Sequence, residues 1–485
     1  MRSDPILFSN IIADLANLSF TQGTFPSCYK TAQVSPLIKK SGLDPDDSSS
    51  FSPCHLFDSP SYSSLQAGYR RSHSTETALL KATNDMFLSA DSGFPSVLIA
   101  LDLSAAFDCV SHGILLDRLG SDFGIAGAAH SWLASYLSNR KHFVKLGDEV
   151  SPTADVVTGV PLGSVLGPLL FATYISPLER LINQFNVGHV SYADDLTLYV
   201  QMQSDVNAVL LQFSNCVNAV VHWFLYNDLL VNTAKSEAMI LGTNQQVKSF
   251  PYKSLDVSGG DLQSVTNFKF LGVTVDSLFT FDNHIGNICS AAHYHLRALR
   301  HIRKCINQKM TNAIACSLIA SRIDYCNAIF SGLSNYNVCR LQRMQNAIAR
   351  VVVNDYSRLH VSEVLQSLHW LPIQFRIDYK ISLLTYKILS TGEPSYLFDM
   401  LFFHVPARSL RSSADGPRLE IPFCKTVLAS RAFSIYAPRL WNGLPFPFRN
   451  SISPSNPPST SLPLSTFKSM LKTHFSTLVF EAGTV

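Results

Sequence analysis

The sequence predicts a mixed fold of helices and strands, and three observations carry this prediction. Residues 96–103 (SVLIALDL) form a continuous apolar run with Asp102 near its end, which is typical of a buried central strand with a carboxylate at its tip. Residues 187–200 (VGHVSYADDLTLYV) predict two short strands that meet at Asp194 and Asp195. Segments with helical periodicity precede and follow these strands.

Helical periodicity, and the turns and loops marked by Gly, Pro and Ser, predict the remaining elements. Ser74 or Thr75 is expected to cap the helix that begins beside them. Residues 41–64 and 450–466 are rich in Ser and Pro and predict irregular loops. The other expected elements are, in chain order, an amphipathic helix and a short strand within 1–40, helices at 65–92, 112–138 and 205–226, strands at 228–242 and 266–276, helices over 285–350, and a last helix at about 466–480.

Composition and charge bound the class of protein. The 485 residues suggest roughly three domains, and an apolar content of 46% with 11% aromatic residues excludes a chain that is disordered throughout. The net charge of +3 hides an asymmetry, because residues 1–284 hold 16 basic and 26 acidic side chains, whereas residues 285–350 hold 9 basic and 1 acidic. We therefore expect an acidic module joined to a basic one, and the basic one is a candidate nucleic-acid surface.

Secretion and membrane insertion are not expected. The first twenty residues contain Asp4 and Asp14 and lack a basic start followed by an apolar run, so no signal peptide is predicted. The ten Cys residues include no CxxC pair and predict reduced thiols in an intracellular protein, in the cytoplasm or the nucleus. Residues 156–178 carry no charge, but their Gly and Pro residues predict a loop followed by a short buried helix and not a membrane span.

Three carboxylates are the strongest candidates for chemistry. If the strands that carry Asp102, Asp194 and Asp195 are neighbours, these side chains converge at one edge of a sheet, where they repel each other unless cations neutralise them. Oxygen ligands of this kind suit Mg²⁺, and two such ions can clamp an in-line phosphoryl displacement. Each motif alone has a plainer interpretation, as a turn or cap residue for a single Asp and as ordinary turn chemistry for an Asp pair.

Several motifs together resemble those of reverse transcriptases. YADD at 192–195, LDLSAAFDCVSH at 101–112 and GVPLGSVLGPLLFATYISPL at 159–178 are closest in wording to the enzymes of LINE-type retrotransposons, which lack long terminal repeats. The resemblance runs from about residue 10 to the C-terminus. Further similar segments, in the family's order, are QAGYRRSHSTETALL (66–80), NTAKSEAMILG (232–242), FKFLGVTVDSLFTFDNHI (268–285), SRIDYCNAIFSGL (321–333) and LHWLPIQFRIDYKI (368–381).

The resemblance implies an α+β fold of the right-hand polymerase type. Residues 1–92 would form incomplete fingers and residues 93–284 a palm with an antiparallel sheet, with the reverse transcriptase domain at about 28–276. Residues 285–350 would form a basic helical thumb, and residues 351–485 a mixed C-terminal region of uncertain fold.

The resemblance also implies an activity. Such an enzyme is an RNA-directed DNA polymerase that adds dNTPs to the 3′-hydroxyl of a DNA primer on an RNA template. Asp102, Asp194 and Asp195 would hold two Mg²⁺ ions, with Mn²⁺ as an alternative, and no small-molecule cofactor is expected. Lys235 would lie near the departing pyrophosphate, or it is a solvated surface lysine. Phe107 would pack beneath the sugar of the incoming nucleotide and exclude a 2′-hydroxyl, or it is a core aromatic.

Other residues are assigned by their place in the motifs. The resemblance implies that Phe270, Leu271 and Gly272 form the turn that holds the primer strand, which would otherwise be a buried strand and a tight turn. The residues expected near the incoming nucleotide, its triphosphate or the template are Leu162, Gly163, Lys39, Lys40, Arg70 and Arg71.

The basic segment fits the thumb of such an enzyme. Four basic residues fall at helical spacings and would form one positive stripe that binds phosphates, while Leu296, Leu299 and Ile302 face inward. A charged stripe is more often a solvated face, but only one acid stands against nine bases here. The stripe consists of Arg297, Arg300, Arg303 and Lys304.

The chain departs from the family pattern in three ways. Leu162 replaces a Gln whose amide normally contacts nucleotide or template, and the segment between Lys40 and Gln66 is too short to hold the family's triphosphate-gripping Arg box. No N-terminal endonuclease is found, so a partial copy of a retrotransposon is expected. Two alternatives to an active polymerase therefore stay open: an inactive relic that only binds nucleic acid, and a truncated product without function.

Overall fold

An antiparallel sheet at the centre of the computed structural model carries the motifs that hold Asp102, Asp194 and Asp195. Its strands lie in the order β10 (Glu237–Leu241), β2 (Ser96–Leu101), β8 (Asp195–Gln201) and β7 (Gly188–Tyr192). The strands predicted at 96–103 and 187–200 are therefore confirmed. The structure describes residues 19, 22–34, 59, 61–161, 163–252, 254–257, 260–354, 360–404, 417–452 and 462–480.

Both faces of the central sheet are buried, which explains the continuous apolar character of β2. Leu98 faces one hydrophobic cluster together with the helix α3 (Thr75–Asp91). Ile99, one residue further along, faces a second cluster together with α8 (Val206–Tyr226). Alternate residues of the strand therefore anchor two different layers of helices.

Helix α3 begins where the capping residues predict. The side chain of Ser74 accepts a hydrogen bond from the backbone N–H of Thr77, and the hydroxyl of Thr77 accepts one from the N–H of Ser74. This reciprocal arrangement satisfies two donors at the start of the helix. Of the two candidates, Ser74 is therefore the cap.

The second layer contains the segment that imitates a membrane span. The described residues between 157 and 165 form a loop, and the ten-residue helix α6 (Leu166–Ile175) that follows is buried, as predicted. Within the described residues, α8 has the length and hydropathy of a membrane span by composition alone, but Phe213, Val217 and other residues of one of its faces are buried in the second cluster.

The predicted helix at 112–138 is two helices. These are α4 (His112–Ser121) and α5 (Gly127–Leu137). The chain between them passes through Gly124 and Gly127, whose φ angles are +67° and +61°. Backbone in this region favours glycine and cannot continue a right-handed helix. The remaining elements of this half are η1 (Ser27–Tyr29), β1 (Thr31–Val34), β3 (Leu103–Ser104), β4 (Arg140–Leu146), β5 (Glu149–Val150), β6 (Ala154–Val156), α7 (Leu178–Asn183), β9 (Leu230–Val231), α9 (Asn244–Ser249), β11 (Ser254–Val257), β12 (Gly260–Gln263), β13 (Asn267–Phe270) and β14 (Val273–Asp276).

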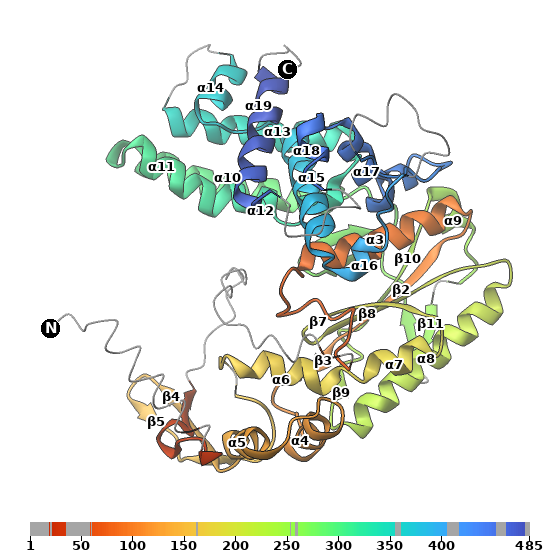
Figure 1. Cartoon of the computed structure of the whole chain (residues 1–485), viewed down its shortest axis with the longest axis vertical. Coiled ribbons are helices and arrows are strands. Elements are labelled where there is room, and N and C mark those ends of the chain that lie inside the picture. Colours follow the sequence, from red (N-terminus) through yellow and green to blue (C-terminus); the bar gives the residue numbers. More distant parts are fainter. Residues whose placement is uncertain are drawn as a thin grey trace.

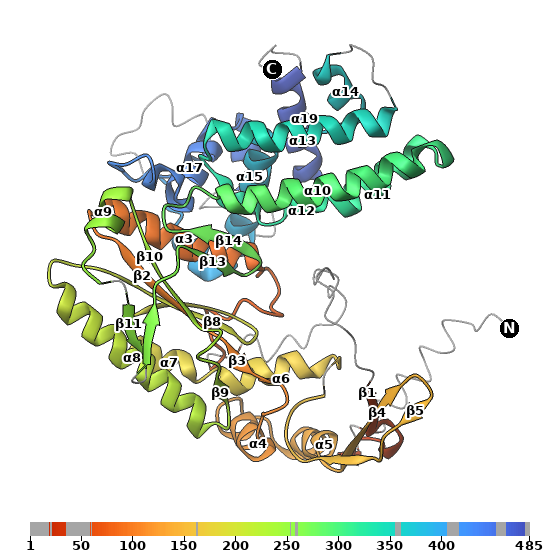
Figure 2. The ribbon, with the colours of Figure 1, turned by 180° about the vertical axis from the view of Figure 1, so that it is seen from behind.

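A block of helices lies on the other side of α3 from the sheet. Figures 1 and 2 show it at the opposite end of the molecule from the small sheet of β1, β4 and β5. Its elements are α10 (Asp282–Ile302), η2 (Arg303–Cys305), α11 (Gln308–Ala315), the π-helical η3 (Cys316–Ala320), α12 (Ser321–Asp324), η4 (Asn327–Phe330), α13 (Asn335–Val353), α14 (Val361–Ser367), α15 (Ile373–Thr391), α16 (Ser395–Phe398), η6 (Ala429–Arg431), α17 (Phe433–Gly443), α18 (Phe446–Arg449) and α19 (Leu464–Phe480).

Residues after 350 share a core with α3 and with the thumb segment. The Glu76 carboxylate lies 3.0 Å from Lys380 Nζ, and the Asn84 side chain accepts a hydrogen bond of 2.9 Å from the Ser434 N–H. One hydrophobic cluster runs from α3 through α10 and α13 to α19. The helix α3, expected to belong to the fingers, therefore links the sheet to the C-terminal helices.

His284 couples this core to pH, which gives a first prediction. It is buried in α10, its Nδ1 accepts a hydrogen bond of 3.2 Å from the Thr274 N–H, and burial lowers its pKa to about 4. Between about pH 4 and pH 6.5, His284 is therefore protonated in the unfolded chain but neutral in the folded chain. The free energy of unfolding should rise between about pH 4 and pH 6.5, by up to about 3 kcal/mol from this residue.

Denaturant titrations across that pH range provide the measurement. The variant His284→Asn keeps a hydrogen-bond acceptor but does not titrate, so its stability should depend less steeply on pH than that of the unmodified chain. The matched control is His301→Asn, an exposed histidine at the end of the same helix. Equal pH dependence of all three proteins would contradict the prediction.

Candidate active site

The register of the sheet brings two of the three carboxylates together. In the pairing of β2 with β8, Leu101 lies opposite Leu196. Asp102 follows the first and Asp195 precedes the second, so continuing the antiparallel register places them side by side at the same end of the sheet. Tyr192 pairs with Asp195 across the hairpin, which leaves Asp194 in a two-residue turn. The convergence expected from the sequence is therefore found for Asp102 and Asp195, with Asp194 in the adjoining turn.

The carboxylates disturb each other electrostatically. The pKa of Asp195 is raised to about 6, first by burial and then by the charges of Asp194 and Asp102, while Lys269 acts in the opposite direction. Within the described part of the chain, Asp102 Oδ2 is buried without a hydrogen-bond partner. Such a cluster favours a bound cation.

Lys235 belongs to this site and also remains open to solvent. Its Nζ lies 3.6 Å from Asp102 Oδ2, and its side chain is 68% exposed. It follows the short strand β9, where the N–H of Asn232 donates to the carbonyl oxygen of Asp102. The same contact therefore fixes both the strand end and the approach of the lysine. An exposed cation beside a carboxylate can contact a phosphate as well.

A cavity of about 120 Å³ opens between these groups. Asp102 and Asp195 line one side, and Lys269 and Leu271 of the hairpin β13–β14 line another. Lys269 was not expected from the motifs. Strand alternation could have predicted its exposure but not its place at the cavity, because Phe268 and Phe270 are buried and yet line the same cavity.

The donor set fits a divalent metal ion that shares its coordination with water. Among the residues that the structure describes, no three His, Cys, Asp or Glu side chains gather closely enough to enclose an ion by themselves. Mg²⁺ does not require such a cage, because it keeps several waters and is commonly held by one or two carboxylates and substrate phosphates. The buried Oδ2 of Asp102 and the neighbouring carboxylate of Asp195 supply the one or two carboxylates that such an ion needs.

The hairpin at the cavity has the form expected of the primer-holding turn. Strands β13 and β14 are antiparallel, and Leu271 and Gly272 between them have φ angles of +44° and +84°. The hydroxyl of Tyr325 donates a hydrogen bond of 2.8 Å to the carbonyl oxygen of Leu271. Phe270 is buried beneath the turn. The tight turn is therefore found, and a role of this turn in holding the primer strand remains a prediction.

Phe107 lies in the second layer of the molecule. Its ring is half-buried, with its centroid 4.6 Å from that of Phe171 in α6, and its carbonyl oxygen accepts a hydrogen bond from Val160. It is not among the residues that line the cavity. Its role in selecting the sugar remains a prediction.

The residues expected to contact the nucleotide are only partly described. Leu162, Lys39 and Lys40 lie outside the described residues. Gly163 occupies a turn with a φ of +76°, and no atom lies within 4 Å of the position that a Cβ would take. A side chain there would be strained by the backbone and not by its neighbours.

Arg70 and Arg71, which were expected in the fingers, differ in how far their guanidinium groups are used within the fold. Arg70 Nη1 donates to the carbonyl oxygen of Ser63 at 3.1 Å, so part of its guanidinium is used within the fold, whereas Arg71 is exposed. Tyr69 precedes them, and its pKa is raised by burial and, to a lesser extent, by the charge of Asp194. This segment therefore runs close to the turn formed by Ala193 and Asp194.

Three of the four basic thumb residues are exposed, as predicted. They are Arg297, Arg300 and Lys304.

The prediction for Arg303 is wrong, because its guanidinium is used inside the fold. Its Nε and Nη2 donate to the carbonyl oxygens of Val351 and Val352 at the end of α13, at 3.0 and 3.1 Å. Helix α10 ends at Ile302, so the helical spacing no longer applies to the residue after it. Ile302 is 44% exposed and does not face inward, although Leu296 and Leu299 do.

Comparison with known proteins leads to the same family as the one that the motifs resemble. The family of reverse transcriptases (RNA-dependent DNA polymerases) matches residues 52–275. The probable RNA-directed DNA polymerase from transposon BS of Drosophila melanogaster is 26% identical over 317 residues, which cover 60% of this chain and 32% of the relative. The RNA-directed DNA polymerase from mobile element jockey of the same organism is 26% identical over 305 residues, which cover 58% and 32%. The chain thus spans about a third of the length of these relatives.

Among solved structures, that of apo telomerase from Candida tropicalis aligns with 66% of this chain and 56% of its own, at 10% identity and a TM-score of 0.34. That score is too low to support an argument about the fold. The assignment rests on the matched family, on the named relatives and on the motifs at the cavity. The chain therefore carries a domain of the reverse transcriptase family, at residues 52–275, as its resemblance to the enzymes of LINE-type retrotransposons predicted.

Proposed function

We propose that this chain is the RNA-directed DNA polymerase of a retrotransposon and adds dNTPs to the 3′-hydroxyl of a primer on an RNA template. The observation that carries the proposal is the cavity at which Asp102, Asp195 and Lys235 meet the turn of the β13–β14 hairpin. A polymerase needs these parts at one place: carboxylates for metal ions, a cation for phosphates and a surface for the primer end.

The right-hand arrangement is part of this proposal. The central antiparallel sheet serves as the palm, because it carries the carboxylates. Helices α10 to α13 serve as the thumb and expose basic side chains. The segment at residues 66–71 and the small sheet of β1 and β4 form the incomplete fingers.

The residues of the site divide the chemical work. Asp102, Asp194 and Asp195 would hold two Mg²⁺ or Mn²⁺ ions, and these ions would supply Lewis-acid stabilisation of the attacking and leaving oxygens. Lys235 is placed to balance negative charge on the departing pyrophosphate, because it is exposed and already lies beside Asp102. Lys269 faces the same cavity and favours the ionised form of Asp195.

Substrates and location follow from this reaction. The proposed partners are an RNA template, a DNA primer and dNTPs, with Phe107 selecting the deoxyribose. We also propose an intracellular location, in the cytoplasm or the nucleus. The buried Cys216 and Cys326 are free thiols, which suits a reducing compartment.

Primer extension tests the proposal directly. The purified chain would be given an RNA template with an annealed 5′-labelled DNA primer, dNTPs and Mg²⁺, and extended primers would be resolved on a gel. We expect products whose sequence follows the template and whose formation stops on chelation of the metal. Binding of the duplex without any extension, in Mg²⁺ and in Mn²⁺, would contradict a polymerase and favour a relic that only binds nucleic acid.

The exposed thumb residues give a second prediction. Replacing Arg297, Arg300 and Lys304 with Gln should weaken binding of the primer–template and make it less sensitive to salt, because fewer counterions are displaced. The slope of log Kd against log salt should fall by about 2 to 3, which is roughly one unit for each phosphate that the protein no longer neutralises. Fluorescence anisotropy at several salt concentrations measures this slope.

A matched variant separates local interactions from net charge. Lys425, Lys468 and Lys472 are exposed bases of the C-terminal helices and their flanking loop. Changing these three to Gln removes the same charge elsewhere, and the salt slope should stay near that of the unmodified chain. Equal effects in the two triple variants would show that the thumb stripe has no special part in binding.

A further inference from the structure

We propose that Gln66 is a positioning residue that fixes the backbone of the catalytic turn at Ala193 and Asp194, and through it the directions of the carboxylates of Asp194 and Asp195. The inference rests on the proposed polymerase activity for its functional consequence. Its structural part concerns the turn alone and can be tested without activity.

Both ends of the Gln66 amide are used on this turn. Oε1 accepts hydrogen bonds of 2.9 Å from the backbone N–H groups of Ala193 and Gly68, and Nε2 donates one of 3.2 Å to the carbonyl oxygen of Ala193. The side chain is fully buried. A single glutamine therefore satisfies both backbone polar groups of the residue that precedes Asp194.

The turn has reason to need such support. Ala193 has a φ of +55°, a left-handed conformation that a residue with a Cβ rarely adopts. The hairpin connects Tyr192 to Asp195 through only two residues, so a change at Ala193 is passed directly to both carboxylates. Strained backbone of this kind persists where surrounding contacts determine it.

Gln66 is itself held in place by the sheet. The N–H of Ala67 donates to the carbonyl oxygen of Ser191 at 2.8 Å, and the N–H of Ser191 donates to that of Leu65 at 3.3 Å. These bonds attach the segment to β7 as a short parallel bridge. A Cβ on Gly68 would lie 2.6 Å from the nitrogen of Ala193, so the two backbones are in close contact.

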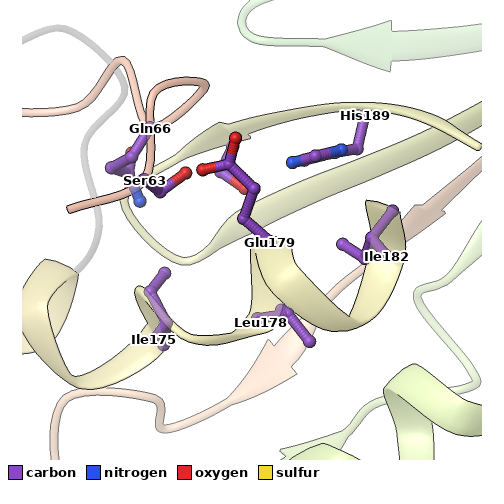
Figure 3. A pocket seen from close by; sticks show the side chains of 8 residues that line it. Ser63, Gln66, Ile175, Leu178, Glu179, Ile182 and His189 are labelled. Atoms are coloured by element: carbon purple, nitrogen blue, oxygen red, sulfur yellow. The ribbon is translucent and has the colours of Figure 1, made fainter. Parts of the chain in front are cut away.

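A binding role for Gln66 is not supported by its surroundings. Figure 3 shows it at one edge of a small pocket, with Glu179 of α7 between it and His189 of β7. That pocket has a volume of about 10 Å³, which is room for one water molecule and not for a substrate. The amide is therefore committed to the turn.

The experiment compares Gln66→Met with Gln345→Met. Methionine keeps a similar volume and removes all hydrogen bonds of the amide. Gln345 of α13 is also buried, and its Nε2 donates to the carbonyl oxygen of Leu371 at 2.8 Å. This residue lies in the thumb segment and not at the turn of Ala193 and Asp194. Both variants thus lose a buried amide that bonds to backbone, and only one of them touches the turn.

Two readouts are combined. Hydrogen–deuterium exchange of the peptide around residues 191–196 should become faster in Gln66→Met and not in Gln345→Met. In primer extension, kcat should fall about 10- to 100-fold in Gln66→Met while the KM for dNTP changes less than about threefold, because positioning affects the chemical step. The variant Gln66→Glu keeps the acceptor for both N–H groups, so it should restore part of the protection and serves if the Met variant does not fold.

The outcomes separate the inference from the proposed function. Unchanged exchange at the turn in Gln66→Met and Gln66→Glu overturns the inference, whatever the activity. Faster exchange in a chain whose unmodified form extends no primer supports the positioning role and overturns the polymerase. Equal losses of kcat in Gln66→Met and Gln345→Met would reduce Gln66 to a general contribution to stability and would also overturn the inference.

Discussion

Replacing Asp195 with Asn is expected to lower the rate of primer extension by about three orders of magnitude or more, because the cavity then loses an anionic group that, in the proposed reaction, would hold the metal ions. The same variant should be at least as stable as the unmodified chain in the absence of metal. The raised pKa of Asp195, caused by burial and then by Asp194 and Asp102, shows that its ionised form is disfavoured in the folded state. Removing that charge relieves the repulsion.

This combination of lost activity and undiminished stability distinguishes a catalytic carboxylate from a structural one. Rates would be measured by single-turnover extension and stability by thermal unfolding in EDTA. Asp102→Asn should lower the rate of primer extension to a similar extent as Asp195→Asn. Asp108→Asn is the matched control, because Asp108 lies in the same motif and is exposed. Loss of activity that only follows a fall in the melting temperature would contradict a catalytic role.

The sequence predicted the centre of this site because the relevant signals are local. A continuous apolar run requires burial on both faces, which makes β2 a central strand. The YADD segment shows two short apolar runs around two acids, which makes a hairpin. Once such strands are neighbours, the antiparallel register places Asp102 beside Asp195 without further information.

Other parts of the site depend on contacts that no spacing reveals. Arg303 fits the helical stripe by count, yet the helix ends one residue earlier and the guanidinium turns to the end of α13. Gln66 lies in a recognised motif, but only the fold shows that its amide holds a turn 127 residues away. Tyr325, which follows α12, reaches the turn of the β13–β14 hairpin in the same manner.

The C-terminal region was the least predictable part, because its strongest contacts join helices that are distant in sequence. Phe467 of α19 is fully buried, and its ring stacks on that of Tyr386 in α15 with centroids 3.7 Å apart. It also lies 6.4 Å from the ring of Trp441 in α17 and 5.7 Å from that of Phe448 in α18. One side chain from the last helix therefore connects four helices.

Phe467→Ala should accordingly destabilise the protein by about 3 to 5 kcal/mol, the usual cost of removing a buried aromatic ring. Because these helices share a hydrophobic cluster with α3 and the thumb, we expect the substitution to lower the midpoint of the transition that unfolds the thumb and α3 as well. Calorimetry combined with hydrogen exchange of α3 measures both effects. Leu464→Ala, at a residue of the same helix that is 43% exposed, should change stability by less than about 0.5 kcal/mol. A separate early transition confined to residues after 350, with α3 still protected, would show instead that the C-terminal helices form an independent domain.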